Sequence, residues 1–224
     1  MKEGPDTRLE FGPPLESRRR VNIMGLVLQE VKTDEEFVPL IAALREGFSN
    51  PNTAVWRLFM GDWRPDDPAA REAALAEATA RMRAEHRADP TSTWLKVVDD
   101  ATGQVVAGGR WSFFEKWCEP TDVEITPVLN ILFTIPEYRR RGAASLVMDW
   151  GVGRADCMGL DVYIEASEGG KLLYEKYGFE TIEESYYEVD EKRLPPPRDA
   201  ELRKEAVKQL SPFRRWSMLR KDKG

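Results

Sequence analysis

The residues between Leu132 and Ser145 have the types and spacing that a phosphate-binding site requires. An apolar strand is expected over residues 128–134, three arginines follow at 139–141, and a helix is expected from Gly142. The first amides of a helix lack intrahelical acceptors, and the helix dipole adds positive charge there. Small residues let a diphosphate approach this backbone, and arginines add charge-assisted hydrogen bonds. The pattern predicts an anion site, although a solvated turn carries the same residues.

Other catalytic chemistry has little support in the sequence. Neither Gly-Lys-Ser/Thr nor Gly-x-Gly-x-x-Gly occurs, which argues against the common nucleotide-binding loops. His86 is the only histidine and lies in a charged helical stretch, where we expect a solvated helix residue rather than a catalytic base or zinc ligand. Cys118 and Cys157 match no metal-site spacing, so no metal is expected, and two cysteines suit a reducing compartment.

Two motifs make the resemblance to a known family specific. After a strand and a Pro-x-Tyr turn, Arg139, Gly142 and Ala144 meet the Gln/Arg-x-x-Gly-x-Gly/Ala pattern. Downstream, residues 163–167 read Tyr-Ile-Glu-Ala-Ser and residues 173–179 read Leu-Tyr-Glu-Lys-Tyr-Gly-Phe. Together they resemble the acetyl-CoA signature of the GNAT superfamily of acyl-CoA N-acyltransferases, in the branch with a Tyr-x-Glu-Ala-Ser strand. The resemblance covers about residues 128–180.

The resemblance implies a fold and a co-substrate. The fold is mixed α/β with α+β character: a central, mostly antiparallel twisted sheet that splays at the acetyl-CoA site and is flanked by helices. The backbone near the end of the central strand would pair with the pantetheine arm of acetyl-CoA, and the loop and helix amides would hold the pyrophosphate. The cofactor-binding residues so implied are Leu132, Phe133, Thr134, Arg139, Arg140, Arg141, Gly142, Ala143, Ala144, Ser145 and Ser167.

The same resemblance implies transfer of an acetyl group to a primary amine by direct attack in a ternary complex. Tyr174 stands where the superfamily commonly places the acid that protonates the departing thiolate. The general base stays open between Glu165 and Glu124, because Asn130 occupies the central strand where some relatives have a carboxylate. In two further departures, serine stands at 167 where asparagine is frequent and glycine at 170 where alanine is frequent.

The acceptor is only weakly indicated. The acidic strand expected over residues 181–189 and the residues after it would attract a cationic amine, yet a solvated strand edge has the same composition. We therefore expect a small-molecule amine as the acceptor. A protein or peptide N-acetyltransferase and a non-catalytic acetyl-CoA-binding module remain as alternatives.

The elements that must position these residues follow from hydrophobic periodicity, caps and breakers. A capping box at residues 33–36 and Asp67 before Pro68 mark two helix starts. We expect strands at 26–31, 92–98, 104–113, 128–134, 160–164, 181–189 and 215–219, and helices after 36, at 68–88, 142–158, 170–177 and 199–209.

Bulk properties limit the partners. The 224 residues suit one domain, expected over residues 24–224 after a flexible leader of residues 1–23. A net charge of −6 argues against nucleic-acid binding, which needs a basic face. No apolar run approaches the roughly 20 residues of a membrane span. We expect a cytoplasmic monomer or homodimer.

Overall fold

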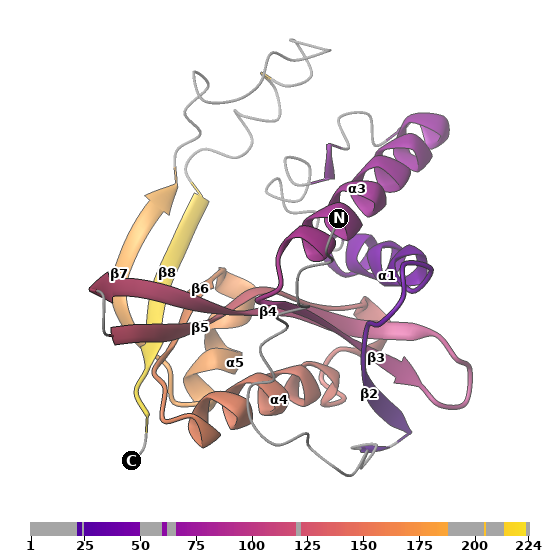
Figure 1. Cartoon of the computed structure of the whole chain (residues 1–224). Coiled ribbons are helices and arrows are strands. Elements are labelled where there is room, and N and C mark those ends of the chain that lie inside the picture. The colour runs from indigo at the N-terminus through magenta and orange to yellow at the C-terminus, as the bar shows by residue number, and fades with distance from the viewer. Residues whose placement is uncertain are drawn as a thin grey trace, which may run out of the picture.

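The computed structural model describes residues 22–23, 25–49, 60–61, 66–119, 122–187, 204 and 213–222, and within these it leaves out the side chains of 22–23, 114–126 and 187. The described residues form an eight-stranded sheet in the order β1-β2-β3-β4-β5-β6-β8-β7 (Figure 1). Neighbouring strands are antiparallel except β5 and β6. The strands are β1 (Asn22–Ile23), β2 (Leu26–Glu30), β3 (Ser92–Asp99), β4 (Val105–Glu119), β5 (Asp122–Thr134), β6 (Val162–Ala166), β7 (Glu180–Tyr187) and β8 (Phe213–Arg220).

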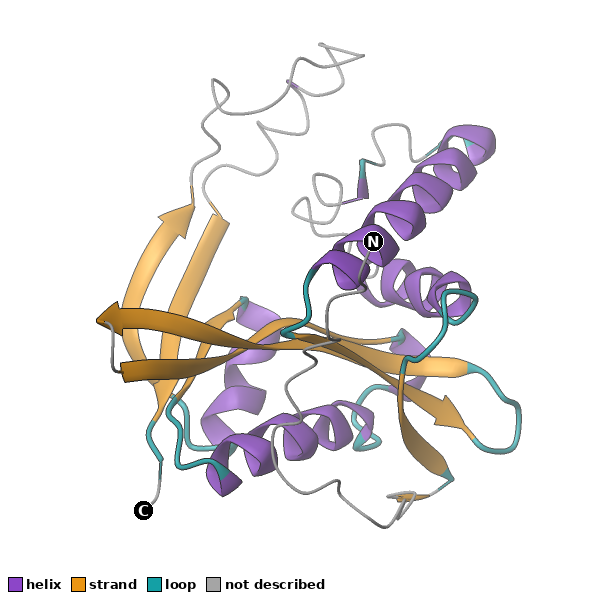
Figure 2. Cartoon of the chain, viewed as in Figure 1, coloured by secondary structure: helices purple, strands orange, loops and turns teal. Residues whose placement is uncertain are grey.

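Helices cover both faces of this sheet (Figure 2). Helices α1 (Phe37–Ser49) and α3 (Pro68–Ala88) lie on one face, and α4 (Ala143–Cys157) and α5 (Glu168–Lys176) on the other. A 3-10 turn, η1 (Pro136–Tyr138), connects β5 to the approach of α4. The mixed, mostly antiparallel fold flanked by helices that the sequence predicted is therefore confirmed.

Local signals explain where the two helices on the α1 face begin. The Asp67 carboxylate accepts hydrogen bonds from the amides of Ala69 and Ala70, and Pro68 occupies the first turn, where its missing N–H costs least. Before α1, the Glu36 carboxylate accepts from the amide of Thr33 at 2.8 Å, which is one of the two bonds of the predicted capping box. The helix itself begins after this box, at Phe37.

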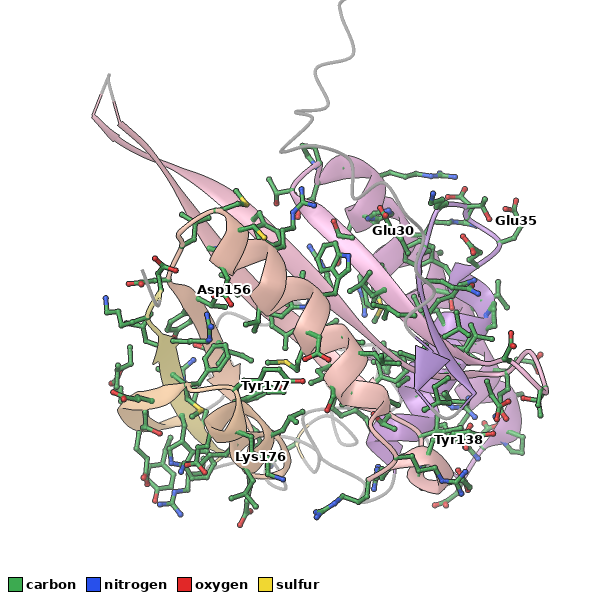
Figure 3. All side chains as sticks on the ribbon, turned by 90° about the horizontal axis from the view of Figure 1, so that it is seen from below. Glu30, Glu35, Tyr138, Asp156, Lys176 and Tyr177 are labelled. Atoms are coloured by element: carbon green, nitrogen blue, oxygen red, sulfur yellow. The ribbon has the colours of Figure 1, made fainter. Side chains whose placement is uncertain are left out.

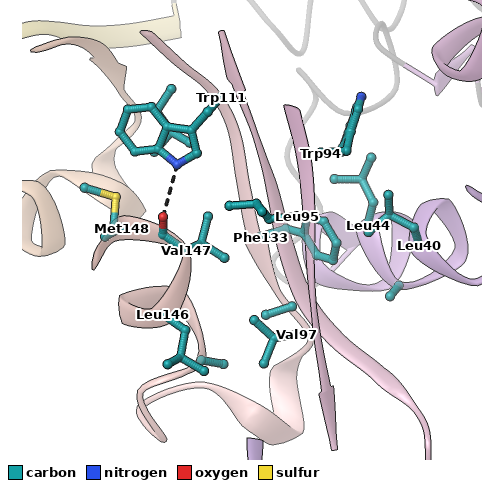
Figure 4. Close-up of a cluster of buried hydrophobic side chains, with 14 of the residues drawn as sticks. Leu40, Leu44, Trp94, Leu95, Val97, Trp111, Phe133, Leu146, Val147 and Met148 are labelled. Atoms are coloured by element: carbon teal, nitrogen blue, oxygen red, sulfur yellow. Dashed lines mark hydrogen bonds between the residues drawn. The ribbon is translucent and has the colours of Figure 1, made fainter. Parts of the chain in front are cut away.

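Trp111 fixes helix α4 against the sheet (Figure 4). Its side chain is completely buried, and its indole N–H donates to the carbonyl of Val147 at 3.1 Å. A Cβ at Gly151 would lie 2.0 Å from the Trp111 ring, so only glycine allows this close approach. On the opposite face, Phe133 and Trp94 pack among the buried leucines of α1. The core therefore sets where α4 begins relative to the end of β5.

Several predicted boundaries were wrong. Strands β4 and β5 pair with each other from Ala107 and Thr134 out to Glu119 and Asp122, well past the expected ends of 113 and 128. Pro127 does not end β5, because pairing with β6 begins only at Val128 and the proline nitrogen can face an unpaired edge.

Smaller differences concern β6 and the chain ends. Strand β6 runs two residues later than the predicted 160–164. Residues 22–23, expected within the leader, form β1, while residues 1–21 lie outside the described residues. The predicted helix at 199–209 also lies outside them, apart from Lys204.

Candidate active site

Strands β5 and β6 separate soon after they meet. They pair at two positions, Val128 with Tyr163 and Leu129 with Ile164. Beyond these pairs β6 continues to pair with β8 and β5 with β4, so the two strands diverge. We call the opening between β5 residues 130–134 and β6 residues 165–166 the fork. It is the splay that the sequence resemblance implied.

A β-bulge lies on β5 where the fork opens. Leu129 pairs with Trp111 and Ile131 with Arg110, which leaves Asn130 without an opposite residue on β4. Bulges bend a strand and increase its twist, which explains why β5 leaves β6 at this point. The Asn130 amide nitrogen donates to the Ser112 hydroxyl at 2.8 Å, on the face of the sheet that carries α1 and α3.

The end of β5 presents backbone polar groups to the fork. The Ile135 amide donates to Val106 on β4 at 2.9 Å. Because antiparallel strands alternate bonded and non-bonded pairs, Phe133 also bonds toward β4, while Leu132 and Thr134 direct their N–H and C=O groups toward the fork. The sequence singled out all three residues, and the structure turns the backbone groups of two of them away from β4. Of these groups, the Thr134 carbonyl accepts from the Arg139 guanidinium at 3.3 Å.

The loop after η1 enters α4 with its amides unpaired. Arg140 has a φ of 63° and Gly142 one of 86°, the second of which glycine adopts without strain. The first helical bond runs from the Leu146 amide to the Gly142 carbonyl at 3.3 Å, and no side chain caps the helix. Among the described residues, the amides of residues 140–145 have no acceptor. This phosphate loop, residues 139–145, has the geometry of an anion site.

Arg139 is used within the protein rather than held open for a ligand. Its guanidinium donates to the carbonyl of Gly47 at the end of α1 at 2.7 Å and to that of Thr134 at 3.3 Å. Its amide donates to the Pro136 carbonyl at 3.2 Å. Arg139 therefore fastens the phosphate loop to β5 and α1, and we no longer assign its side chain or amide to an anion.

The other two arginines remain available. The Arg141 guanidinium lies over the Tyr138 ring, 4.9 Å from its centroid, and is near enough to Asp99 to help lower the pKa of that carboxyl. Arg140 is exposed and has no ion-pair partner among the described residues. Arg140 is therefore the side chain best placed to add positive charge beside the unpaired amides.

Tyr174 is buried on α5 and keeps its hydroxyl unpaired. Its exposed fraction is 7%, its ring centroid lies 6.1 Å from that of Phe179, and its hydroxyl makes no hydrogen bond with any described residue. Burial raises the pKa of the Tyr174 phenol well above its ordinary value. The phenol therefore stays protonated near neutral pH.

Tyr177, three residues later, connects α5 to α4 (Figure 3). Its hydroxyl donates to the Asp149 carboxylate at 2.7 Å and lies 3.1 Å from the Ser145 carbonyl. Burial, together with the Asp149 carboxylate, raises the pKa of Tyr177 to about 12. The contact joins the helix carrying Tyr174 to the first turn after the phosphate loop.

The two candidate bases have different positions. Glu165 is the first β6 residue past the last pair with β5, next to Asn130, and accepts from the Arg215 guanidinium at 2.7 Å. Glu124 lies in the β4–β5 hairpin opposite Lys116, six positions before Asn130 and on the order of 20 Å along the strand. Because β5 begins earlier than expected, the structure does not bring Glu124 to the fork.

The remaining sequence candidates lie at the edges of the site or away from it. Ser167 is exposed at the start of α5, directly after β6, and its side chain does not cap the helix. His86 lies against Phe37, with ring centroids 5.5 Å apart, far from the fork in the α3 helix. Within the described part of the chain, no cluster of three or more potential metal ligands exists. None of the helices described there is long and apolar enough to cross a membrane.

Residues 52–179 match the family model described as "Acetyltransferase (GNAT) family". The chain belongs to the GNAT family. A curated relative, "Probable acyltransferase SID5" of Ajellomyces capsulatus, is 29% identical over 94 residues, which cover 42% of this chain and 61% of that protein. The match thus spans about three fifths of that relative's length.

Solved GNAT structures share the fold at low sequence identity. One is described as histone acetyltransferase HPA2 and related acetyltransferase, from Corynebacterium glutamicum; it has a TM-score of 0.57 and 15% identity, with 90% of this chain and 98% of that one covered. Another is the PaiA N-acetyltransferase of Thermoplasma acidophilum in complex with coenzyme A, with a TM-score of 0.51, 12% identity and coverages of 88% and 99%.

GNAT enzymes use acyl-CoA as the acyl donor. Three features of this GNAT protein can be compared with the parts of such a molecule: a strand edge turned away from β4, unpaired amides at the start of α4, and the largely buried side chain of Tyr174. The motif residues at the first two features were visible in the sequence. The Asn130 bulge was not, because an asparagine in an apolar strand does not by itself reveal a bulge.

Proposed function

We propose that this protein transfers an acetyl group from acetyl-CoA to the primary amine of a small molecule by direct attack in a ternary complex. One observation carries the proposal: the open edge of β5 ends where the unpaired amides of residues 140–145 begin. An acyl-CoA is an amide-containing chain that ends in a diphosphate, so this continuous row of backbone groups matches it along its length.

In this complex the pantetheine arm pairs with the backbone groups of Leu132 and with the amide of Thr134 like an additional strand. The pyrophosphate accepts hydrogen bonds from the amides at the start of α4, where the helix dipole also favours negative charge. Arg140 adds a charge-assisted hydrogen bond from the rim. Acetyl-CoA bound in this way has its thioester directed toward the fork.

The reaction requires an unprotonated amine, a donor for the oxyanion and an acid for the thiolate. The amine nitrogen attacks the thioester carbon, and a backbone amide of β5 facing the fork stabilises the oxyanion that forms. When the carbon–sulfur bond breaks, its electron pair goes to sulfur, which takes the Tyr174 phenolic proton. The proton lost by the amine passes to Glu165, directly or through water, and solvent exchange restores both groups.

Support for an amine acceptor comes from the face of the fork opposite α4 and α5. Glu165 and Asn130 are exposed there and offer a carboxylate and an amide to a cationic or hydrogen-bonding group. The acidic β7 contributes less than its composition suggests, because Glu184 accepts hydrogen bonds from Arg214 and from the Trp216 indole. The amine assignment therefore rests on the Glu165 carboxylate and the Asn130 amide at the fork, and not on the acidic residues of β7.

The test is thiol release from acetyl-CoA with a panel of small amines and short peptides, with products identified by mass spectrometry. Acetylation of small amines in preference to peptides supports the proposal. Acetylation of peptides alone favours a peptide N-acetyltransferase. Tight acetyl-CoA binding without acetylation of any amine would indicate a binding module and end the catalytic proposal.

The donor site has its own test. Gly142→Asp places a side chain and a negative charge at a φ of 86° in the phosphate loop, so acetyl-CoA binding should be lost. Gly153→Asp is the control, because a Cβ at this other α4 glycine meets nothing within 4 Å. If the two folded variants bind acetyl-CoA with equal affinity, the phosphate loop is not part of the acetyl-CoA site.

A further inference from the structure

The described sheet consists of two parts that meet over a short stretch. Strands β1 to β5 form the β5 part, and β6, β8 and β7 form the β6 part. The parts pair at two positions, where β5 residues 128 and 129 lie opposite β6 residues 163 and 164. Helix α4 packs on β2 to β5, whereas α5 packs on β6 and β8. The proposed acetyl-CoA site therefore has one wall from each part.

The wall from the β5 part consists of the end of β5, the phosphate loop and the start of α4. The Arg139 guanidinium fastens the loop to α1 through the Gly47 carbonyl at 2.7 Å. The Trp111 indole fastens α4 to β4 through the Val147 carbonyl at 3.1 Å. Neither of these bonds reaches β6 or α5, so they do not set the distance between the two walls.

Tyr177 connects the two walls. It follows α5 directly, and its hydroxyl has two acceptors on α4, the Asp149 carboxylate at 2.7 Å and the Ser145 carbonyl at 3.1 Å. Its own carbonyl accepts from Nε of Arg220 on β8 at 3.0 Å. Tyr177 is thus anchored in the β6 part by its backbone and holds the β5 part by its hydroxyl.

The place of this contact along α4 gives it its importance. At the C-terminal end of α4 the chain itself joins the parts, because α4 ends at Cys157 and β6 begins at Val162. Arg220 also donates to the Asp156 carboxylate there, from Nη2 at 3.0 Å. The Tyr177 hydroxyl bonds to the other end of α4, beside the phosphate loop. With one end of α4 joined to β6 by the chain, this bond limits how far the walls can separate at the other end.

We propose that Tyr177 is a positioning residue, whose hydroxyl holds the two walls at the separation that the pantetheine arm of acetyl-CoA requires. The inference rests on the proposed function, in which this arm lies in the fork and the pyrophosphate lies at the phosphate loop. Tyr177 acts through α4 and not by contact with the ligand. Walls that are held at this separation before binding lose less conformational freedom when acetyl-CoA binds, so the affinity is higher.

Tyr177→Phe tests the inference because it removes the hydroxyl at little cost to folding. Asp149 is exposed, so water can replace the phenol, and the Ser145 carbonyl lies within α4, where the helix backbone uses it. We expect the dissociation constant for acetyl-CoA, measured by isothermal titration calorimetry, to rise about fivefold, the usual effect of one lost hydrogen bond. Tyr186→Phe is the control, because Tyr186 is 59% exposed on β7, and its affinity should match the wild type.

A truncated donor separates a role at the fork from a role in the phosphate loop. Adenosine 3′-phosphate 5′-diphosphate carries the pyrophosphate of coenzyme A without the pantetheine arm. It should bind Tyr177→Phe as tightly as it binds the wild type, because it needs the loop but not the fork. If both ligands bind the variant equally more weakly, Tyr177 shapes the loop instead, and the inference is wrong. It is also wrong if neither affinity changes.

Amide hydrogen exchange of the ligand-free protein tests the contact without any ligand. Tyr177→Phe should speed exchange in α5 and in the first turns of α4, because the bond between them is lost, and Tyr186→Phe should not. Unchanged exchange in Tyr177→Phe would refute the contact while the proposed function stands. A wild-type protein that binds neither acetyl-CoA nor the truncated donor would overturn the proposed function, and the role given to Tyr177 with it.

Discussion

The Tyr138 phenol donates a 2.6 Å hydrogen bond to the Asp99 carboxylate, which joins the turn before the phosphate loop to the turn between β3 and β4. The same carboxylate accepts from the amides of Ala101 and Thr102. The bond from Tyr138, followed by these amide bonds, holds the pKa of Asp99 below its ordinary value. An ionised Asp99 therefore anchors the loop from outside the site.

Tyr138→Phe tests this anchor by removing one hydroxyl and keeping the ring under Arg141. We expect the dissociation constant for acetyl-CoA to rise several-fold, because the loop amides would be less well pre-organised. Isothermal titration calorimetry measures the change, and thermal unfolding checks that the fold is retained. Unchanged affinity would show that the loop holds its shape without Asp99.

Two adjacent arginines should give opposite results. Arg139→Ala removes the bonds to Gly47 and Thr134 and should lower the free energy of unfolding by about 1 kcal/mol. Arg140→Gly removes a charge beside the amides and relieves a φ of 63°. It should raise the free energy of unfolding by about 1 kcal/mol and weaken acetyl-CoA binding about tenfold.

Denaturant unfolding measures the free energy of unfolding of both variants, and calorimetric titration measures their affinity for acetyl-CoA. Arg140→Lys is the control for charge, since it keeps a cation and the left-handed backbone conformation. If Arg140→Gly binds acetyl-CoA as tightly as the wild type does, Arg140 has no part in the donor site.

Sequence patterns predicted most elements here because caps, breakers and periodicity act over a few residues. Asp67 before Pro68 and glycine at 142 mark the starts of α3 and α4 in the positions expected. The motif spacing also placed the open end of β5 next to an uncapped helix. The order of the elements was thus readable from local signals alone.

Contacts between distant segments were not predictable in this way. The Arg139 guanidinium meets Gly47 across 92 positions, and this distance in sequence explains why residue type suggested a phosphate ligand instead. Glu124 was a candidate base because β5 was expected to begin after it, whereas pairing with β4 extends the strand past it.

Glu36 should make the stability of the fold depend on pH. Partial burial raises the pKa of this carboxyl. Hydrogen bonds from Lys96 and from the amides of Lys32 and Thr33 lower the pKa by more than burial raises it, so that the result is about 2. Because the folded protein holds this proton less tightly than the unfolded chain, the stabilisation is complete above the unfolded pKa of about 4.5. It is lost as the pH falls toward about 2.

The contribution of Glu36 at neutral pH should be on the order of 2 kcal/mol, with partial solvent screening allowed for. Glu36→Gln should lower the free energy of unfolding by about this amount at pH 7 and by little near pH 2. Other carboxyls titrate in the same range, so the measured quantity is the difference between the two proteins in urea unfolding at each pH. A difference that does not shrink as the pH falls would contradict the assignment.

Glu165 forms an ion pair with Arg215, and this pair allows its proposed role as a base to be separated from a structural one. Glu165→Gln and Arg215→Met both break the pair at the fork, but only the first removes the carboxylate. If Glu165 takes the proton of the amine, Glu165→Gln should lower turnover at saturating amine about a hundredfold, in the range of general base catalysis. Arg215→Met should lower it far less, since the carboxylate remains.

Neither variant should alter acetyl-CoA affinity measured by calorimetry, because neither residue touches the phosphate loop. Equal losses of turnover in the two variants would mean that the ion pair, and not the carboxylate as a base, is what the reaction requires.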